Sequence, residues 1–327
     1  MAYTREDMVP LLNGFVTDFG KIEHELQKAV VGQAEALRVS IAALILGGHV
    51  LIEGLPGTGK TFLGKTLADV VSMTTSRIQC TPDLMPTDII GSYVIMETAQ
   101  GRRAFEFQRG PLFSNIVLAD QINRATPRTQ SALLEAMEQE AISVSSETFH
   151  LPSPFTLIAT QNPLEQEGVY PLPEAQVDRF FFHTKTSMPT EQEMQTLIER
   201  STGSQLPVLN RVADGTKILK MREIVKNVSI SDDLIRFCIS IMQKSQPTNP
   251  SAPNDVKNFV RYGVGPRGAQ ALVLAAKFNA ATRQQMDVSK EDIVQMAPPT
   301  LRHRIFLNYN GQAEEISKDS IIEQLVK

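Results

Sequence analysis

Short apolar runs alternate with longer segments over the first two thirds of this 327-residue chain. The clearest runs lie at Val50–Glu53, Ile116–Asp120, Phe155–Thr160 and Phe180–Thr184. Nearly continuous apolar runs of this length are typical of strands that helices cover on both faces of a parallel sheet. Lys60–Val71 and Thr129–Gln139 are predicted helices, the second with its apolar residues at helical spacing. The pattern therefore predicts an α/β fold built on a parallel sheet.

Two stretches interrupt this alternation. Ser92–Met96 and Ala104–Gln108 flank a turn-like connection, and they predict an inserted β-hairpin. Ile142–Ser145 and Phe149–Leu151 predict a second hairpin. From the pattern alone, surface ribbons without a function are an equally good interpretation of both.

The pattern changes after Met188, where most segments are helical. The helices predicted there are Glu191–Arg200, Lys217–Asn227, Asp232–Gln243, Arg267–Ala280 and Lys290–Met296. Connections rich in Pro and Asn separate them. We therefore predict two domains, an α/β domain over residues 1–188 and a small all-helical domain over residues 189–327.

The composition is that of an ordinary globular protein, and it argues against several functional classes. The 32 basic and 36 acidic residues leave a net charge of −4, which gives no support for nucleic-acid binding through bulk charge. The strongest apolar run, Ile41–Leu46, is far below the ~20 residues that span a bilayer, and the first residues lack the apolar core of a signal peptide. Two cysteines argue against a disulfide framework or a thiolate zinc site. We expect a cytoplasmic protein without membrane insertion.

A glycine-rich loop joins the strand Val50–Glu53 to the helix that begins at Lys60. It consists of Gly54, Leu55, Pro56, Gly57, Thr58, Gly59, Lys60 and Thr61. Its glycines permit a tight backbone path and leave amide groups free to surround phosphate oxygens. Lys60 can reach the β- and γ-phosphates, the Thr61 hydroxyl can ligate magnesium, and the helix presents its positive dipole end to the same anion. The loop therefore predicts a nucleoside triphosphate site, with a chance glycine-rich turn as the weaker alternative.

A second candidate ligand stands at the end of the strand Ile116–Asp120. In P-loop proteins, an Asp at this position holds magnesium through its water shell. A strand-end Asp by itself is more often a cap or a turn residue. Downstream of a phosphate loop, however, Asp120 is interpreted as the partner of Thr61 at a magnesium site.

Several segments, in order along nearly the whole chain, resemble the MoxR family of AAA+ ATPases. They include Val31–Gln33, the phosphate loop, Asp83–Gly91, Gly110–Phe113, Ile122–Ala125, Gln130–Glu138, Ala159–Pro163 and Tyr170–Gln176. The resemblance implies a P-loop AAA+ sheet core with inserted hairpins, followed by a helical lid domain. It also implies that the protein binds ATP and Mg2+.

The resemblance further implies roles for residues around the nucleotide. Val31, Gly32 and Gln33 would line the adenine pocket. Asn162 would orient the attacking water or contact the γ-phosphate, a role that suits an amide because it offers both a donor and an acceptor. An Asn that caps a helix or a turn is the common alternative.

Two arginines resemble residues that stabilise charge during hydrolysis in the family. Arg179 would be the arginine finger supplied to the nucleotide of the neighbouring subunit, and the alternative is an Arg paired with a nearby acid such as Asp178. Arg267 would place a cation over the phosphates from the lid, although the two residues before its Pro-Arg pair depart from the family pattern. Arg124 is a weaker candidate for a contact across subunits.

One position departs from the P-loop class. Gln121 stands directly after Asp120, where these ATPases normally have the Glu that polarises the hydrolytic water. Gln cannot accept a proton as a carboxylate does, so the chemical step should be slower by about 10²–10⁴-fold while ATP and magnesium still bind. Either a Glu→Gln change was introduced to trap ATP, or the natural protein hydrolyses slowly, and the intact surroundings favour the introduced change. Glu174 is a candidate substitute base.

The function that the resemblance implies is an ATP-driven remodelling or chaperone motor that forms a homo-oligomeric, hexameric ring. Such proteins mature other protein complexes, insert metal cofactors and act with partners that carry a von Willebrand factor A domain. The hairpins would face the pore or partners, with Arg102 and Arg103 at the tip of the first. The alternatives are a motor subunit like that of magnesium chelatase and a non-hydrolysing, nucleotide-gated assembly module. A nucleic-acid motor ranks last because the chain lacks a basic stripe.

Overall fold

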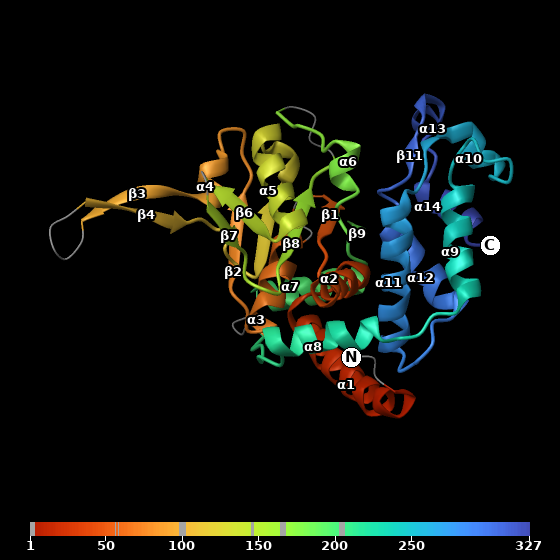
Figure 1. Cartoon of the computed structure of the whole chain (residues 1–327), viewed down its shortest axis with the longest axis horizontal. Helices are drawn as coiled ribbons and strands as arrows, with labels where there is room; N and C mark the ends of the chain where they lie inside the picture. The colour runs from red at the N-terminus through yellow and green to blue at the C-terminus, as the bar shows by residue number, and fades with distance from the viewer. Residues whose placement is uncertain are drawn as a thin grey trace.

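A five-stranded parallel β-sheet forms the centre of the molecule, as the alternating pattern predicts (Figure 1). The computed structural model describes residues 4–55, 57, 59–97, 103–144, 147–163, 168–202 and 207–327. The strands of this sheet are β1 (Val50–Gly54), β2 (Thr75–Gln79), β5 (Ile116–Asp120), β8 (Thr156–Gln161) and β9 (Phe182–Thr186). They lie in the order β2-β5-β8-β1-β9, so β1, which leads into the phosphate loop, lies beside β8 in the interior of the sheet.

Alternate residues of the strands face two separate hydrophobic cores, one on each side of the sheet. Along β5, Ile116 and Leu118 belong to one core, and Val117 and Ala119 belong to the other. The first core includes residues of α1 (Arg5–Ala29), α2 (Ala34–Leu46) and α3 (Lys60–Val70). The second includes residues of α5 (Pro127–Gln139). Burial on both faces explains why these strands are apolar throughout.

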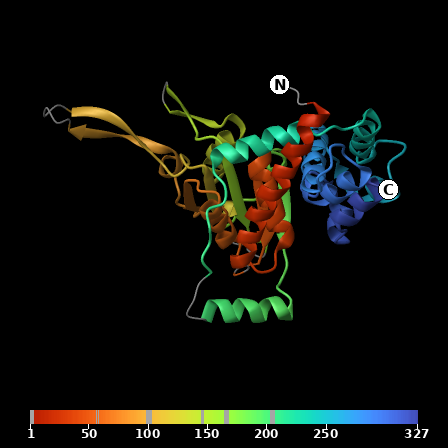
Figure 2. The ribbon, with the colours of Figure 1, turned by 90° about the horizontal axis from the view of Figure 1, so that it is seen from below.

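Both predicted hairpins are present as antiparallel pairs outside the central sheet. They consist of β3 (Gly91–Glu97) with β4 (Arg103–Arg109), and of β6 (Ala141–Val144) with β7 (Glu147–His150). The β3–β4 hairpin follows the short helix α4 (Pro86–Ile90) and projects far from the body of the molecule (Figures 1 and 2). The two hairpins touch, since the Tyr93 hydroxyl donates a hydrogen bond to the Glu147 carboxylate at 2.9 Å. Of the predicted tip residues, Arg103 begins β4 and Arg102 lies outside the described residues.

The chain after residue 188 is mostly helical, as predicted. Its helices are α7 (Glu191–Thr202), α8 (Gly215–Lys226), α9 (Asp232–Lys244), α10 (Asn254–Phe259), α11 (Pro266–Thr282), α12 (Lys290–Leu301), α13 (Tyr309–Ala313) and α14 (Lys318–Leu325). A short antiparallel pair that the pattern did not predict joins them, β10 (Val260–Tyr262) with β11 (Phe306–Leu307). Phe278 of α11 packs edge-on against Phe15 and Phe19 of α1, so the first core continues into this region. The predicted domain boundary at residue 188 stays a prediction.

Candidate nucleotide-binding site

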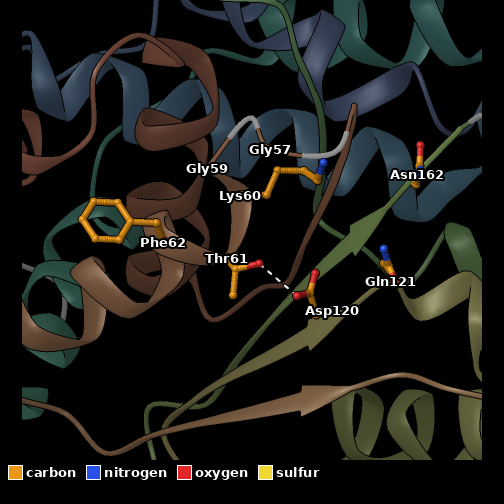
Figure 3. Close-up of a pocket in the computed structure, with 8 residues that line it drawn as sticks. All are labelled: Gly57, Gly59, Lys60, Thr61, Phe62, Asp120, Gln121 and Asn162. Carbon is orange, nitrogen blue, oxygen red and sulfur yellow. Dashed lines mark hydrogen bonds between the residues drawn. The ribbon is translucent and has the colours of Figure 1, made fainter. Parts of the chain in front are cut away.

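The carboxyl ends of β1, β5 and β8 bring most of the predicted site residues together. These three strands are neighbours in a parallel sheet, so their ends share one edge, where ligands of open α/β sheets commonly bind. We call the cavity at this edge the nucleotide pocket (Figure 3), and its lining consists of Gly57, Gly59, Lys60, Thr61, Phe62, Asp120, Gln121 and Asn162. Pro56 and Thr58 of the predicted loop lie outside the described residues. Four residues of the predicted loop, Gly57, Gly59, Lys60 and Thr61, thus lie around one space with the strand-end Asp and the predicted sensor Asn, whereas Gly54 and Leu55 do not line it.

The backbone of the loop depends on glycine. Gly57 and Gly59 adopt φ angles of 80° and 78°, a left-handed conformation that side chains disfavour. Gly54 is needed for a different reason, because a Cβ atom there would lie 1.8 Å from Oγ1 of Thr186 on the neighbouring strand β9. Lys60 is buried, and its ammonium group donates hydrogen bonds to the carbonyl oxygens of Gly54 at 2.7 Å and Leu55 at 2.6 Å. The side chain of Lys60 therefore lies along the inside of its own loop.

Helix α3 is held close to strand β5, and this brings Thr61 to Asp120. A Cβ atom on Gly64 would lie only 1.9 Å from Cδ2 of Leu118, so a larger residue would have to displace the buried Leu118 side chain or the helix. At the start of the same helix, the Thr61 hydroxyl donates a hydrogen bond to Oδ2 of Asp120 at 3.0 Å (Figure 3). The two predicted magnesium ligands are therefore neighbours.

Asp120 is ionised in this setting. Burial alone would raise the pKa of its carboxyl group, but hydrogen bonds from Thr160, Arg77 and Thr61 hold that pKa below its ordinary value. The Thr160 hydroxyl donates to Oδ1 at 2.6 Å, and the Arg77 guanidinium lies 2.7 Å from Oδ2. Neither Thr160 nor Arg77 was predicted from the sequence, where a polar residue on β2 or β8 carries no sign of its partner.

Gln121 and Asn162 complete the wall of the pocket opposite the loop. Gln121 has a φ of 56°, and its backbone N–H donates to the hydroxyl of Thr160 at 2.9 Å. The guanidinium of Arg124 donates to Oε1 of Gln121 at 3.3 Å, so Arg124 contacts the pocket from within its own chain. Asn162 is buried, and its carbonyl oxygen accepts a hydrogen bond from Asn123 at 3.4 Å. Gln121, at the predicted water-polarising position, and Asn162, the predicted sensor, thus line the same pocket.

A second, more apolar cavity opens beside the first. Its lining includes Val31, Gln33, Gly57, Gly59 and Phe62, together with Leu197 and Arg200 of α7 and the flanking residues Pro189 and Pro207. Gly32, between two lining residues, is not itself among the residues that line this cavity, and a Cβ atom on it would be 3.2 Å from the Glu193 carboxylate of α7. The two cavities share Gly57, Gly59 and Phe62, as expected for a site that holds phosphates on one side and a base on the other. Helix α7 was predicted, but its position over this cavity was not.

The two predicted charge-stabilising arginines lie elsewhere. Neither Arg179 nor Arg267 lines the nucleotide pocket. Both contact Glu138 at the end of α5, Arg179 at 2.5 Å and Arg267 at 3.4 Å. Glu174, the candidate substitute base, belongs to α6 (Glu174–Val177), forms an ion pair with Arg261 and does not line the pocket either. We call Arg179, Arg267 and Glu138 the arginine cluster.

The pocket fits a triphosphate with a magnesium ion. Its lining offers a buried ammonium group, left-handed glycines at the start of a helix, one hydroxyl and one carboxylate, which are the groups that P-loops use. Among the described residues, no cluster of three or more His, Cys, Asp or Glu side chains could hold a metal by itself. Magnesium sites of this class commonly rely on one or two protein ligands plus phosphate oxygens.

In the part of the chain that the structure describes, no helix has the length and apolar character needed to cross a bilayer.

Comparison with known proteins agrees with this geometry. A sequence model of the ATPase family associated with various cellular activities (AAA) matches residues 49–182, and one of the AAA lid domain matches residues 254–325. The fold and the pocket therefore define a P-loop ATPase of the AAA class.

Individual relatives narrow the class further. The chain is 39% identical over 303 residues to the protein named Chaperone MoxR1 of Mycobacterium tuberculosis, covering 93% of this chain and 79% of that one. It is 27% identical to the protein named MoxR of Paracoccus denitrificans, with 94% and 93% covered. A crystal structure of a proposed ATPase from Cytophaga hutchinsonii superposes with a TM-score of 0.90 at 34% identity, covering 97% of this chain and 96% of that one. The chain belongs to the MoxR family of AAA+ ATPases.

Proposed function

We propose that this protein is an ATP-dependent chaperone that remodels or matures other protein complexes. The observation that carries the proposal is the convergence of Lys60, Thr61, Asp120, Gln121 and Asn162 on one pocket at the edge of the sheet. The similarity to a relative named as a chaperone supports the remodelling role. We expect the protein to act in the cytoplasm.

Each side chain of the pocket has a role that its chemistry allows. Lys60 would leave the carbonyl oxygens of the loop and place its charge on the β- and γ-phosphates. Thr61 and Asp120 would hold Mg2+, which supplies charge neutralisation to the phosphates when it is bound. Asn162 would orient the attacking water beside Gln121. Val31, Gly32 and Gln33, with Phe62 and α7, would enclose the adenine.

Gln121 limits the chemistry to slow hydrolysis. An amide in the place of the usual carboxylate can hydrogen-bond to water but cannot take its proton at neutral pH. Asp120, Thr61 and Lys60 keep their arrangement around it, so ATP and Mg2+ binding is unaffected in our proposal. Gln121 would therefore act as an ATP-trapping substitution.

The arginine cluster supports assembly of several copies. Arg179 and Arg267 have about a third and half of their side-chain surface exposed (31% and 49%), so both can leave Glu138 for another anion. Arginine fingers act on the nucleotide of a neighbouring subunit in many ATPases of this class. We propose that the two arginines complete the pocket of an adjacent copy in a ring, and we expect this ring to be a hexamer.

We propose that a protein with a von Willebrand factor A domain is the partner, and that metal-cofactor insertion is one outcome of its action. The β3–β4 hairpin is a candidate contact surface, since Ile95, Met96 and Phe105 on it are exposed. Exposed apolar residues on a projecting ribbon are typical of interaction sites.

The first experiment is equilibrium binding of a fluorescent ATP analogue with Mg2+. We expect the native chain to bind and the Lys60→Ala variant to lose binding. Lys65→Ala is the matched control, because Lys65 lies on the same helix, is exposed and carries the same charge. Equal binding by all three proteins would contradict the proposed site.

The second experiment is a pull-down with the ATP-bound protein, combined with its mass in solution by ultracentrifugation. Recovery of a protein with a von Willebrand factor A domain, on a ring-sized particle, supports the proposal. Recovery of a porphyrin-handling subunit would instead favour a motor of the magnesium-chelatase kind.

A further inference from the structure

Arg77 has no part in the proposed mechanism, yet it forms an ion pair with the carboxylate of the metal site. Its Nη2 atom lies 2.7 Å from Oδ2 of Asp120. Arg77 belongs to β2, the edge strand beside β5, and the register pairs Gln79 of β2 with Asp120 of β5. Residues two apart on a strand share a face, so Arg77 and Gln79 lie on the same side of the sheet as Asp120. The contact follows from the fold of the two strands and involves no irregular loop.

The guanidinium lies at the Asp120 oxygen that also contacts Thr61, on the side of the carboxylate where the metal would be held. Oδ2 of Asp120 accepts hydrogen bonds from the Thr61 hydroxyl at 3.0 Å and from Arg77, whereas Oδ1 accepts from Thr160. Oδ2 is therefore the oxygen that faces the other predicted magnesium ligand. The oxygen Oε1 of Gln79 also accepts a hydrogen bond from Nη2 of Arg77 at 2.6 Å, which fixes the guanidinium in this place.

The local charges make this contact important. Among the described residues that line the nucleotide pocket, only Asp120 carries a carboxylate. A second carboxylate is missing because Gln121 stands where these ATPases normally have a Glu. Arg77 neutralises that single negative charge. A divalent cation held by the Asp120 carboxylate, directly or through water, and a guanidinium paired with the same carboxylate would be close enough to repel each other.

Arg77 also has room to leave. Its side chain is 55% exposed, compared with 13% for Asp120. It lines an open groove between α3 and β2, together with Thr61, Lys65 and Ser76. A long, half-exposed side chain beside an open groove can swing away without disturbing the core.

We propose that Arg77 is an internal counter-cation of the magnesium site, paired with Asp120 when no metal is bound and displaced from Asp120 by Mg2+. This inference rests on the proposed binding of ATP and Mg2+ at the pocket. Two consequences follow from it. Without metal, Arg77 shields the phosphates from the charge of Asp120 and so supports binding of the free nucleotide. With metal, Arg77 competes for Oδ2 and raises the Mg2+ concentration that the site requires.

The test is equilibrium binding of a fluorescent ATP analogue to the full-length protein, first in EDTA and then across a Mg2+ titration. We expect Arg77→Gln to bind the metal-free nucleotide about fivefold more weakly, and to reach half of its Mg2+ response at about fivefold less Mg2+, as expected for loss of a half-exposed ion pair. Arg77→Lys keeps the charge and should stay close to the native protein. Arg77→Met, which keeps the length of the side chain, serves as a second neutral variant if Arg77→Gln does not fold.

Arg5→Gln is the matched control. Arg5 forms an ion pair of the same length, 2.7 Å, with Asp287, and neither residue lines the nucleotide pocket. The control should match the native protein in both measurements. An unchanged or raised Mg2+ requirement in the neutral Arg77 variants would overturn the inference while leaving the nucleotide site intact. Absence of nucleotide binding by the native protein would instead overturn the proposed function and this inference together.

Discussion

The nucleotide pocket and the arginine cluster differ in how their charges are satisfied. In the pocket, the Lys60 ammonium group donates to neutral carbonyl oxygens of its own loop, those of Gly54 and Leu55. In the cluster, Arg179 and Arg267 share one carboxylate, that of Glu138. The pocket thus has a positive charge directed at its interior, and the cluster has two positive charges held at a half-exposed acid.

This difference indicates which parts of the site one chain supplies to itself. The loop, the predicted metal ligands and the predicted sensor lie at the ends of adjacent strands of one sheet or at the start of α3, so folding alone assembles them. Arg179 and Arg267 are not brought to this pocket by folding. In our account they act only when a second copy places its own pocket beside them.

The largest expected effect concerns the chemistry inside the pocket. Restoring the carboxylate with Gln121→Glu should raise steady-state ATP turnover by about 10²–10⁴-fold, the usual contribution of a general base. The double variant with Lys60→Ala should remain inactive, which excludes a contaminating ATPase. If turnover does not rise, Gln121 does not limit hydrolysis, and a nucleotide-gated module becomes the better description of the protein.

The second prediction concerns the stability of the central sheet and α5, to which both the nucleotide pocket and the arginine cluster are attached. His49, just before β1, is buried, accepts a hydrogen bond from the backbone N–H of Leu157 at 3.0 Å and contacts the Met137 carbonyl oxygen at 3.1 Å. Burial lowers the pKa of His49 to about 4, although the hydrogen bond to Met137 opposes this. Because the unfolded chain takes up this proton near pH 6.5, the neutral form stabilises the fold above that pH.

The sign of the pH effect follows from that lowered pKa. The free energy of unfolding should fall by about 3 kcal/mol from His49 as the pH drops from 6.5 to 4. The pKa of His303 is lowered by burial as well, and it acts in the same direction. Denaturant titrations at several pH values across this range give the free energy of unfolding at each pH. This free energy should change less with pH for His49→Gln than for the native protein. The same dependence of this free energy on pH in both proteins would show that His49 does not titrate as described.

The third prediction tests the contact that brings Thr61 to Asp120. Gly64→Ala should destabilise the protein by about 1–3 kcal/mol, since its Cβ would overlap Leu118. Gly20→Ala, in the middle of α1, has nothing within 4 Å of the added Cβ and should stabilise by about 0.5–1 kcal/mol. Opposite signs in thermal unfolding support the close approach of α3 to β5. A stabilising Gly64→Ala would refute it.

The smallest effect is expected in the arginine cluster. Glu138→Gln should change the free energy of unfolding by less than about 1 kcal/mol, because all three side chains are at least about a third exposed. Chemical denaturation at low salt measures this change. A loss of several kcal/mol would mean that the ion pairs hold the fold together, and the cluster would then not be free to serve a neighbour.

The sequence predicted the fold where burial forces a pattern on the residues. Strands β1, β5 and β8 are buried on both faces, so their apolar runs were visible. Strand β2, with the sequence Thr-Ser-Arg-Ile-Gln, lies at the edge of the sheet and was missed, because only Ile78 in it is buried. The pair β10–β11 is too short to show any period.

The residues of the site could be predicted where they belong to a continuous segment of the sequence. Lys60 and Thr61 belong to one contiguous motif, and Asp120 ends a recognisable strand. Contacts between strands, such as those of Arg77 and Thr160 with Asp120, depend on strand order, which no local pattern contains. The pairing of Arg179 and Arg267 with Glu138 brings together residues of α5, of α11 and of the connection between α6 and β9, and only the structure reveals it.

We propose that one chain supplies the pocket and its neighbour supplies the arginines. Mixing two inactive proteins, each carrying Gln121→Glu to restore the base, tests this arrangement. One also carries Lys60→Ala and has intact arginines, and the other also carries Arg179→Ala and has an intact pocket. In a ring assembled from equal amounts, about a quarter of the interfaces would join an intact pocket to an intact Arg179. We predict that the mixture hydrolyses ATP although neither protein does so alone. A mixture that stays inactive while forming mixed rings, or full activity of the Arg179→Ala protein alone, would contradict the account.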